Sequence, residues 1–158
     1  NESYLQLVRQ QLPDLPTENI LLEPARKNTA PCIAYASYKI HKLNPHAVTV
    51  VAPSDHLITK EDTYIKAIRA CFAKAKSEHC LVTLGIKPTR PDTGYGYIQH
   101  AETQKNGGYD VLRFKEKPDL KTAEALLLAG HHVWNSGLFV LKASTWLSAL
   151  KSPSISST

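Results

Sequence analysis

Apolar residues recur at helical spacing in several parts of the chain. The clearest example lies between residues 61 and 76, where Ile65, Ile68, Cys71 and Phe72 form one stripe, with acids in the first turn and lysines near the last. Proline, glycine and capping signals bound similar stretches. This spacing predicts helices over residues 1–12, 29–43, 61–76 and 119–130.

Between these helices lie short apolar runs that are typical of strands. Val50, Val51 and Ala52 form a continuous apolar run, as in a strand covered on both faces. Strands are expected over 18–24, 47–53, 80–87 and 131–143, with a hairpin of 94–102 and 108–118. Alternating strands and helices favour a three-layer α/β domain with a largely parallel sheet. Ligands of such sheets bind at the carboxyl ends of the strands.

Composition narrows the class of protein further. A chain of 158 residues with 42% hydrophobic residues can bury one core, and no apolar run approaches a membrane span. A soluble, cytoplasmic protein without membrane contact is expected. Cys32, Cys71 and Cys80 lack metal-ligand spacing and are interpreted as reduced packing residues. The net charge of +5 is dispersed, which disfavours nucleic acid and leaves a phosphorylated small molecule open.

The first polar group at a predicted strand end lies in EPARKNTAP. Glu23 ends a strand there, and Asn28 and Thr29 open the following helix. The free N–H groups of a helix N-terminus favour anions or polar ligands. Capping of the helix by Asn28 or Thr29 explains the same residues without any ligand.

The second group lies in VVAPSDHLI, where a carboxylate directly follows a buried strand. Asp55 at that position is well placed to hold Mg²⁺, which prefers oxygen ligands and commonly bridges to substrate phosphates. The alternative is that Asp55 caps the turn that leads to Glu61.

Two further strand ends carry residues suited to a sugar phosphate. In DTGYGYI the glycines let the backbone approach a ligand closely, although a bulge or turn explains them too. FKEKP and WNSGLF supply Glu116, Lys117 and Asn135. An acid and an amide suit sugar hydroxyls and a lysine suits a phosphate, while surface charge is the alternative for Glu116 and Lys117.

These motifs, in this order, resemble the sugar-1-phosphate nucleotidylyltransferases and, within them, the mannose-1-phosphate guanylyltransferases. The resemblance extends from about Ile20 to Leu141 through EPARKNTAPCIA, VVAPSDHLI, TGYGYI, FKEKP and WNSGLF. It implies a Rossmann-like nucleotidyltransferase domain with a mostly parallel, mixed sheet that is incomplete at both ends. A partial domain over 1–150 and a polar tail over 151–158 are expected.

The resemblance implies a Mg²⁺-dependent reaction of GTP with mannose 1-phosphate that gives GDP-mannose and pyrophosphate, in a possible homo-oligomer. A carboxylate that only accepts, such as Glu23, suits the two donors on one edge of guanine. By resemblance the catalytic residues are Asp55, also the metal ligand, and Lys117, which contacts the sugar phosphate. The implied nucleotide residues are Glu23, Asn28, Thr29, Pro53 and Ser54, and the implied sugar residues are Gly96, Glu116 and Asn135.

The sequence departs from the family pattern at both ends. No glycine-rich G-x-G-x-R loop precedes Glu23, and a second metal-binding aspartate expected after the NSG segment is missing. The chain is therefore interpreted as a central portion of a longer enzyme that is inactive by itself. Three alternatives remain: a related enzyme for another nucleotide or hexose, a non-catalytic nucleotide-sugar-binding module, and an α/β domain whose polar residues only cap helices and face solvent.

Overall fold

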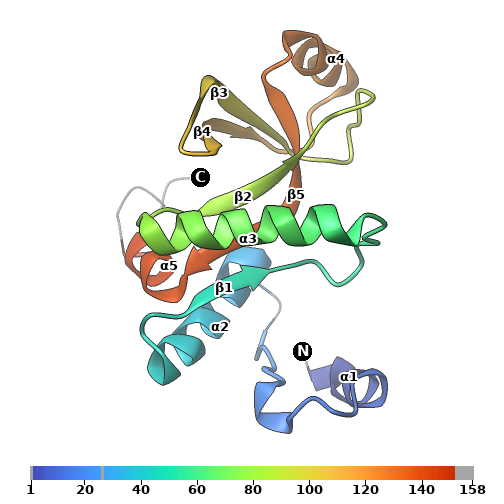
Figure 1. Cartoon of the computed structure of the whole chain (residues 1–158). Coiled ribbons are helices and arrows are strands. Elements are labelled where there is room, and N and C mark those ends of the chain that lie inside the picture. The colour runs from blue at the N-terminus through green and yellow to red at the C-terminus, as the bar shows by residue number, and fades with distance from the viewer. Residues whose placement is uncertain (1, 26, 152–158) are drawn as a thin grey trace. The chain divides into compact units, whose positions relative to one another are not determined.

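A computed structural model describes residues 2–25 and 27–151 (Figure 1). The chain divides into two compact units. The first unit comprises residues 1–47 and 143–158, and the second unit comprises residues 48–142. Apart from Lys151, the predicted polar tail over 151–158 lies outside the described residues. No described helix has the length and apolar character needed to cross a membrane.

The first unit is helical in its described residues. Its elements are the 3₁₀ turns η1 (Glu2–Tyr4) and η2 (Thr17–Asn19) and the helices α1 (Leu5–Gln11), α2 (Thr29–Leu43) and α5 (Ala143–Ala149). Helices α2 and α5 are in contact, and Ile33 and Ser37 of α2 are buried. The helices predicted over 1–12 and 29–43 are confirmed, whereas α5 was not predicted.

The strand predicted over 18–24 is wrong. Residues 17–19 form η2, and residues 20–23 have no regular structure. No strand occurs among the described residues of this unit, so the segment lacks a backbone partner with which a ladder could form. Pro16 and Pro24 bracket it and remove further donors.

The second unit is built on one sheet. Its described strands are β1 (Val48–Val51), β2 (Val82–Ile86), β3 (Tyr97–Lys105), β4 (Gly108–Lys115) and β5 (His132–Lys142). Strand β5 pairs with β1, β2 and β3, and β3 also pairs with β4. The α/β class is confirmed by this mixture of helices and strands.

The expectation of largely parallel pairing is wrong for the described strands, because every pair is antiparallel. Strands β1 and β2 both run opposite to β5, so they share one direction. Val140 of β5 pairs with Val50 of β1 and with Val82 of β2, which places β5 between them. Strands β1 and β2 are therefore parallel in direction, as the predicted strand–helix–strand order implies, but antiparallel β5 lies between them. Strand β5 was expected to join a parallel sheet.

Two helices cover the sheet of the second unit (Figure 1). Helix α3 (Glu61–Ser77) packs Ile68, Cys71 and Ala75 against Val140 of β5. Helix α4 (Leu120–Ala129) buries Ala123 against Tyr97 and Trp134. Both helices lie where the apolar spacing predicts them. Burial of these side chains fixes β3 and β5 relative to one another.

Local signals set the ends of α4 and of the hairpin. The Asp119 side chain accepts a 2.8 Å hydrogen bond from the backbone N–H of Thr122, and Gly130 ends α4 in the left-handed conformation, φ 77°. Asn106 and Gly107 have φ of 47° and 78° in the β3–β4 turn. Two positive φ values match the right-handed twist of a two-residue hairpin, so the predicted hairpin is confirmed.

Candidate functional site

The segment after β1 forms an exposed turn at Ser54 and Asp55. Pro53 is partly buried, and its ring faces β5: a Cβ built on Gly137 would lie 3.2 Å from Pro53 Cγ. Gly137 has φ of 72°, which other residues rarely adopt, so glycine allows this close approach. The segment that includes Asp55 is thereby held against the NSG segment of β5.

Asp55 makes no hydrogen bond or ion pair within the described part of the chain, although Asp92 and Asp119 accept backbone N–H bonds there. The alternative that Asp55 caps its turn is therefore not supported. Its exposed carboxylate is available to a cation. No cluster of three or more histidine, cysteine or acidic side chains suited to a metal occurs in the described ranges.

Three predicted sugar residues converge: Gly96 just before β3, Glu116 just after β4, and Asn135 within β5. The backbone N–H of Asn135 in β5 donates a 2.8 Å hydrogen bond to the carbonyl of Gly96, just before β3. A Cβ on Gly96 would lie 2.7 Å from Glu116 Oε2 and 3.6 Å from Asn135 Cβ. The missing side chain of Gly96 thus leaves the space that the Glu116 carboxylate occupies beside Asn135.

Lys117 lies next to this group, at the exit of β4. Its ammonium is 3.7 Å from Glu116 Oε1, and the two side chains are 65% and 71% exposed, respectively. An exposed ion pair of this length contributes little to stability. Both charges therefore stay available to a ligand. Lys117 also has φ of 37°, which turns the chain sharply after the strand.

The Asn135 side chain is oriented by its own backbone. Its Oδ1 accepts a 3.1 Å hydrogen bond from the N–H of Gly137, which leaves the amide N–H₂ group as donor. Ser136 points the other way: its hydroxyl donates a 2.6 Å bond to the carbonyl of Leu84 and accepts one from the N–H of Leu138. In the NSG segment, the amide of Asn135 is thus a donor at the site, while the Ser136 side chain is bonded within the sheet.

The loop that leads into Gly96, at the start of the DTGYGYI motif, is held in place by Asp92. Asp92 accepts a 2.8 Å bond from the N–H of Gly94 and a 2.6 Å bond from Arg90, and these contacts lower the pKa of its carboxyl. The Tyr97 hydroxyl donates to the carbonyl of Asp92 and accepts from its N–H, both at 3.0 Å. Asp92 was assigned no role from the sequence.

Aromatic rings lie over the same loop. The Arg90 guanidinium is 5.3 Å from the Trp134 ring centroid, and Tyr95 contacts Trp134 edge to face at 5.1 Å. Trp134 is buried, while Tyr95 is 45% exposed. Tyr95 is thus the ring beside Gly96 that a ligand can reach.

In the first unit, Glu23 and the start of α2 lie together. Burial raises the pKa of the Cys32 thiol in the first turn of α2, and the nearby Glu23 carboxylate raises it further. Asn28 precedes α2 with φ of 66° and makes no side-chain cap bond. Capping by Asn28 is therefore not supported, and its amide is available beside the exposed Thr29.

The structure thus groups the predicted residues by unit. Gly96, Glu116, Lys117 and Asn135 lie together in the second unit, with Pro53 packed against the same segment of β5. Glu23 and the residues that open α2 lie together in the first unit.

Comparison with known proteins identifies the relatives. The sequence matches the nucleotidyl transferase family over residues 1–158. It is 41% identical over 159 residues to the mannose-1-phosphate guanylyltransferase of Escherichia coli (strain K12), covering 96% of this chain and 33% of that protein. It is 42% identical over 153 residues to the xanthan biosynthesis protein XanB of Xanthomonas campestris pv. campestris (strain B100), covering 96% and 32%.

A solved structure gives the same result for the fold. The crystal structure described as mannose-6-phosphate isomerase from Helicobacter pylori matches with a TM-score of 0.82 and 34% identity, over 98% of this chain and 59% of that one. The resemblance read from the motifs is confirmed. The chain spans about a third of the length of the curated relatives it matches, in agreement with the interpretation as a portion of a longer protein.

Proposed function

Because the chain belongs to the nucleotidyl transferase family, we propose that the protein containing it transfers GMP from GTP to mannose 1-phosphate. A phosphate oxygen of mannose 1-phosphate forms a bond to the α-phosphorus of GTP, and the bond to the β-phosphate oxygen breaks. The products are GDP-mannose and pyrophosphate. The observation that supports this most is the convergence of Gly96, Glu116 and Asn135, in the company of relatives named mannose-1-phosphate guanylyltransferase.

The sugar phosphate is recognised by complementary groups. Glu116 accepts hydrogen bonds from sugar hydroxyls, and the Asn135 amide donates to them. Gly96 leaves room for the ring to approach the backbone. The Lys117 ammonium attracts the phosphate, and its charge stabilises the transferring phosphoryl group.

The nucleotide is recognised mainly in the first unit. The Glu23 carboxylate accepts from the two donors on one edge of guanine, while Asn28 and Thr29 offer polar groups at the N-terminus of α2. The family resemblance also assigns Pro53 and Ser54 to the nucleotide. These roles rest on the family resemblance and on the free state of the Asn28 side chain.

Asp55 suits a magnesium ion in this scheme. Mg²⁺ keeps several waters and takes one or two carboxylates together with substrate phosphates, so a single exposed carboxylate fits without a larger protein cluster. A bound cation neutralises phosphate charge and orients the reacting groups. Divalent-metal dependence, a cytoplasmic location, a homo-oligomer and the absence of nucleic acid and membrane partners remain predictions.

The test is pyrophosphate release from mannose 1-phosphate with each of the four nucleoside triphosphates and Mg²⁺, using the full-length protein. We expect release with GTP and little with the others. Release with another nucleotide would favour a related nucleotidylyltransferase. Binding of GDP-mannose without any turnover would favour a non-catalytic module.

Base selection is tested by Glu23→Gln. The change removes an acceptor-only group, so the KM for GTP should rise selectively. Glu18→Gln, in the exposed turn η2, is the matched control and should leave the nucleotide preference unchanged. An equal loss with all four nucleotides in Glu23→Gln would mean that Glu23 is structural.

A further inference from the structure

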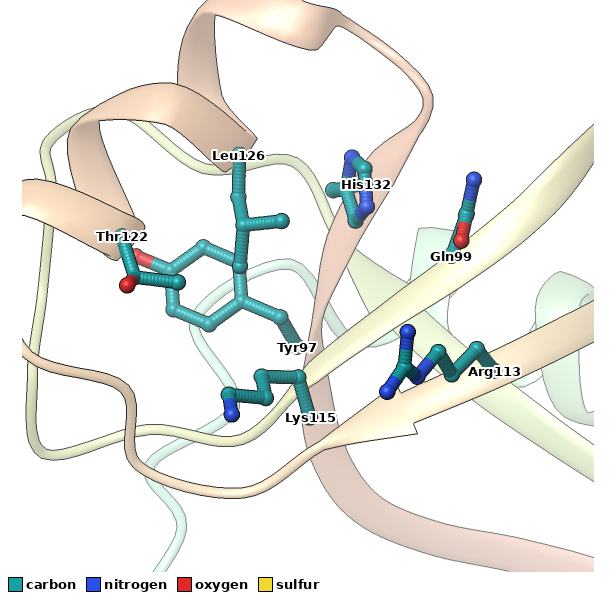
Figure 2. Close-up of a pocket in the computed structure, with 7 residues that line it drawn as sticks. All are labelled: Tyr97, Gln99, Arg113, Lys115, Thr122, Leu126 and His132. Carbon is teal, nitrogen blue, oxygen red and sulfur yellow. The ribbon is translucent and has the colours of Figure 1, made fainter.

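A pocket between α4 and the sheet lies apart from the predicted site residues. Its volume is about 240 Å³ (Figure 2). It is lined by side chains of three strands and one helix, namely Tyr97, Gln99, Arg113, Lys115, Thr122, Leu126 and His132. None of them has a role in the proposed transfer of GMP.

The pocket opens on the α4 side of the β3–β4 hairpin. Tyr97 pairs with Lys115 and Gln99 pairs with Arg113, so these four side chains project from one face of the sheet. Gly96 and Glu116 are the immediate neighbours of Tyr97 and Lys115. Because adjacent residues of an extended chain point to opposite faces, the pocket and the predicted sugar site lie back to back on the hairpin.

The charged groups of the lining are cationic. Arg113 and Lys115 form no ion pair within the described residues, whereas Lys105 on the same hairpin is paired with Asp110 at 2.9 Å. The lining includes no carboxylate. The N–H of Thr122 donates to the Asp119 carboxylate and lowers the pKa of that carboxyl, and the charge of Lys115 lowers it further.

Among the remaining lining residues, the half-buried Leu126 and His132 offer a surface for a ring. Tyr97 is fully buried at the floor, with its hydroxyl bonded to Asp92, and Leu126 packs beside it. Gln99 and Thr122 add polar groups at the edge (Figure 2). Burial lowers the pKa of His132, and His100 and His131 lower it further, so its ring is neutral at pH 7 and adds no charge.

We propose that this pocket binds a small phosphorylated molecule, with the phosphate held by Arg113 and Lys115 and a sugar-sized ring against Leu126 and His132. Arg113 and Lys115 are two residues apart on β4 and project from the same face, so a phosphate there can accept from the arginine fork and from the ammonium together. Pockets for drug-sized ligands measure roughly 300–1,000 Å³. The smaller volume here selects a ligand below the size of a nucleotide.

The probe is glucose 6-phosphate, titrated calorimetrically into the full-length protein, with glucose and inorganic phosphate as separate titrants. We expect glucose 6-phosphate to bind and glucose not to bind. Arg113→Gln and Lys115→Gln should each weaken binding about tenfold, as expected for one charge-assisted hydrogen bond at an exposed site. Both residues are exposed, so the variants should unfold at the temperature of the unaltered protein.

Two control variants locate the binding. Lys121→Gln removes an exposed cation of α4 that does not line the pocket and should leave the affinity unchanged. Glu116→Gln alters the predicted sugar site and should also leave it unchanged. In the unaltered protein, the Nε–Hε signal of Arg113 should shift on titration, which gives a readout that needs no substitution.

Several results would overturn the proposal. One is that glucose 6-phosphate does not bind at millimolar concentration. Another is that Glu116→Gln weakens its binding and Arg113→Gln does not. A third is that Lys121→Gln weakens its binding as much as Arg113→Gln does. Inorganic phosphate binding as tightly as glucose 6-phosphate would refute the contact with a ring. Transfer of GMP is measured separately, so failure of either proposal leaves the other intact.

Discussion

Replacing Gly96 with alanine tests whether the geometry of the predicted sugar site matters for the reaction. The new Cβ would lie 2.7 Å from Glu116 Oε2, while ordinary contact begins at 3.4 Å. The carboxylate must therefore withdraw by about 0.7 Å. Misplacement of a positioning group by about 1 Å can cost about a hundredfold in rate. We expect kcat/KM for mannose 1-phosphate to fall between tenfold and a hundredfold.

The same substitution should hardly affect stability. Gly96 has no left-handed φ, and the atom that must move is the end of a flexible, 71% exposed side chain. The free energy of unfolding should therefore change by no more than about 0.5 kcal/mol, as for other surface substitutions. A large loss of activity with an unchanged fold is the signature of a misplaced carboxylate.

The assay is pyrophosphate release with varied mannose 1-phosphate at saturating GTP, paired with urea unfolding of the same preparation. Gly108→Ala is the control, since its new Cβ would meet only Lys74 at an ordinary 3.6 Å, and its activity should match that of the unaltered protein. Unchanged kcat/KM in Gly96→Ala would refute the placement of Glu116 at the sugar. A loss in Gly108→Ala as well would trace the effect to the sheet.

Three further predictions concern the metal ligand, the sheet and pH. Asp55→Asn should lower turnover by orders of magnitude, because the variant loses the carboxylate assigned to the metal. The unfolding temperature should not change, because the carboxylate is exposed. Normal turnover in the variant would remove Asp55 from the site. Gly85→Ala places a Cβ 2.2 Å from Val133 Cγ2 inside the sheet and should cost about 1–3 kcal/mol in urea unfolding; a change below about 0.5 kcal/mol would contradict this packing. The pKa of His132 is lowered below its unfolded value of 6.5, so the free energy of unfolding should decrease as pH falls below about 6.5. His132→Gln should flatten this pH dependence when unfolding is measured from pH 5 to 8. An unaltered pH dependence in the variant would exclude His132 as its source.

The sequence predicts the helices of this fold better than its sheet pairing. Helix α3 and the β3–β4 hairpin follow from local spacing and turn residues, which act within a few positions. The antiparallel insertion of β5 between β1 and β2 depends on pairs that are 48 to 94 residues apart, and nothing in HHVWNSGLFVLKA specifies which strands it will pair with. Helix α5 was missed because Ala143 continues the apolar pattern of β5.

Candidate site residues could be predicted where they lie in motifs at the ends of predicted strands. The motifs assign Gly96, Glu116 and Asn135 to the sugar by resemblance, and the three residues lie together in the structure. Arg90 and Asp92 were missed because a charged pair two residues apart in a loop looks like ordinary surface charge. Their function is visible only through the buried hydroxyl of Tyr97, which ties the loop to the core.

The glycines of the second unit show how one residue type serves both stability and function. The neighbour that excludes a side chain at Gly85 is Val133 of the sheet, so its substitution should destabilise the fold. At Gly96 the neighbour is the mobile Glu116 carboxylate, so its substitution should disturb the ligand contacts and spare the fold. Gly137 combines a positive φ with contact to Pro53, which couples the backbone of β5 to the segment that presents Asp55. The identity of the excluded neighbour, more than the glycine itself, therefore separates a structural glycine from a functional one.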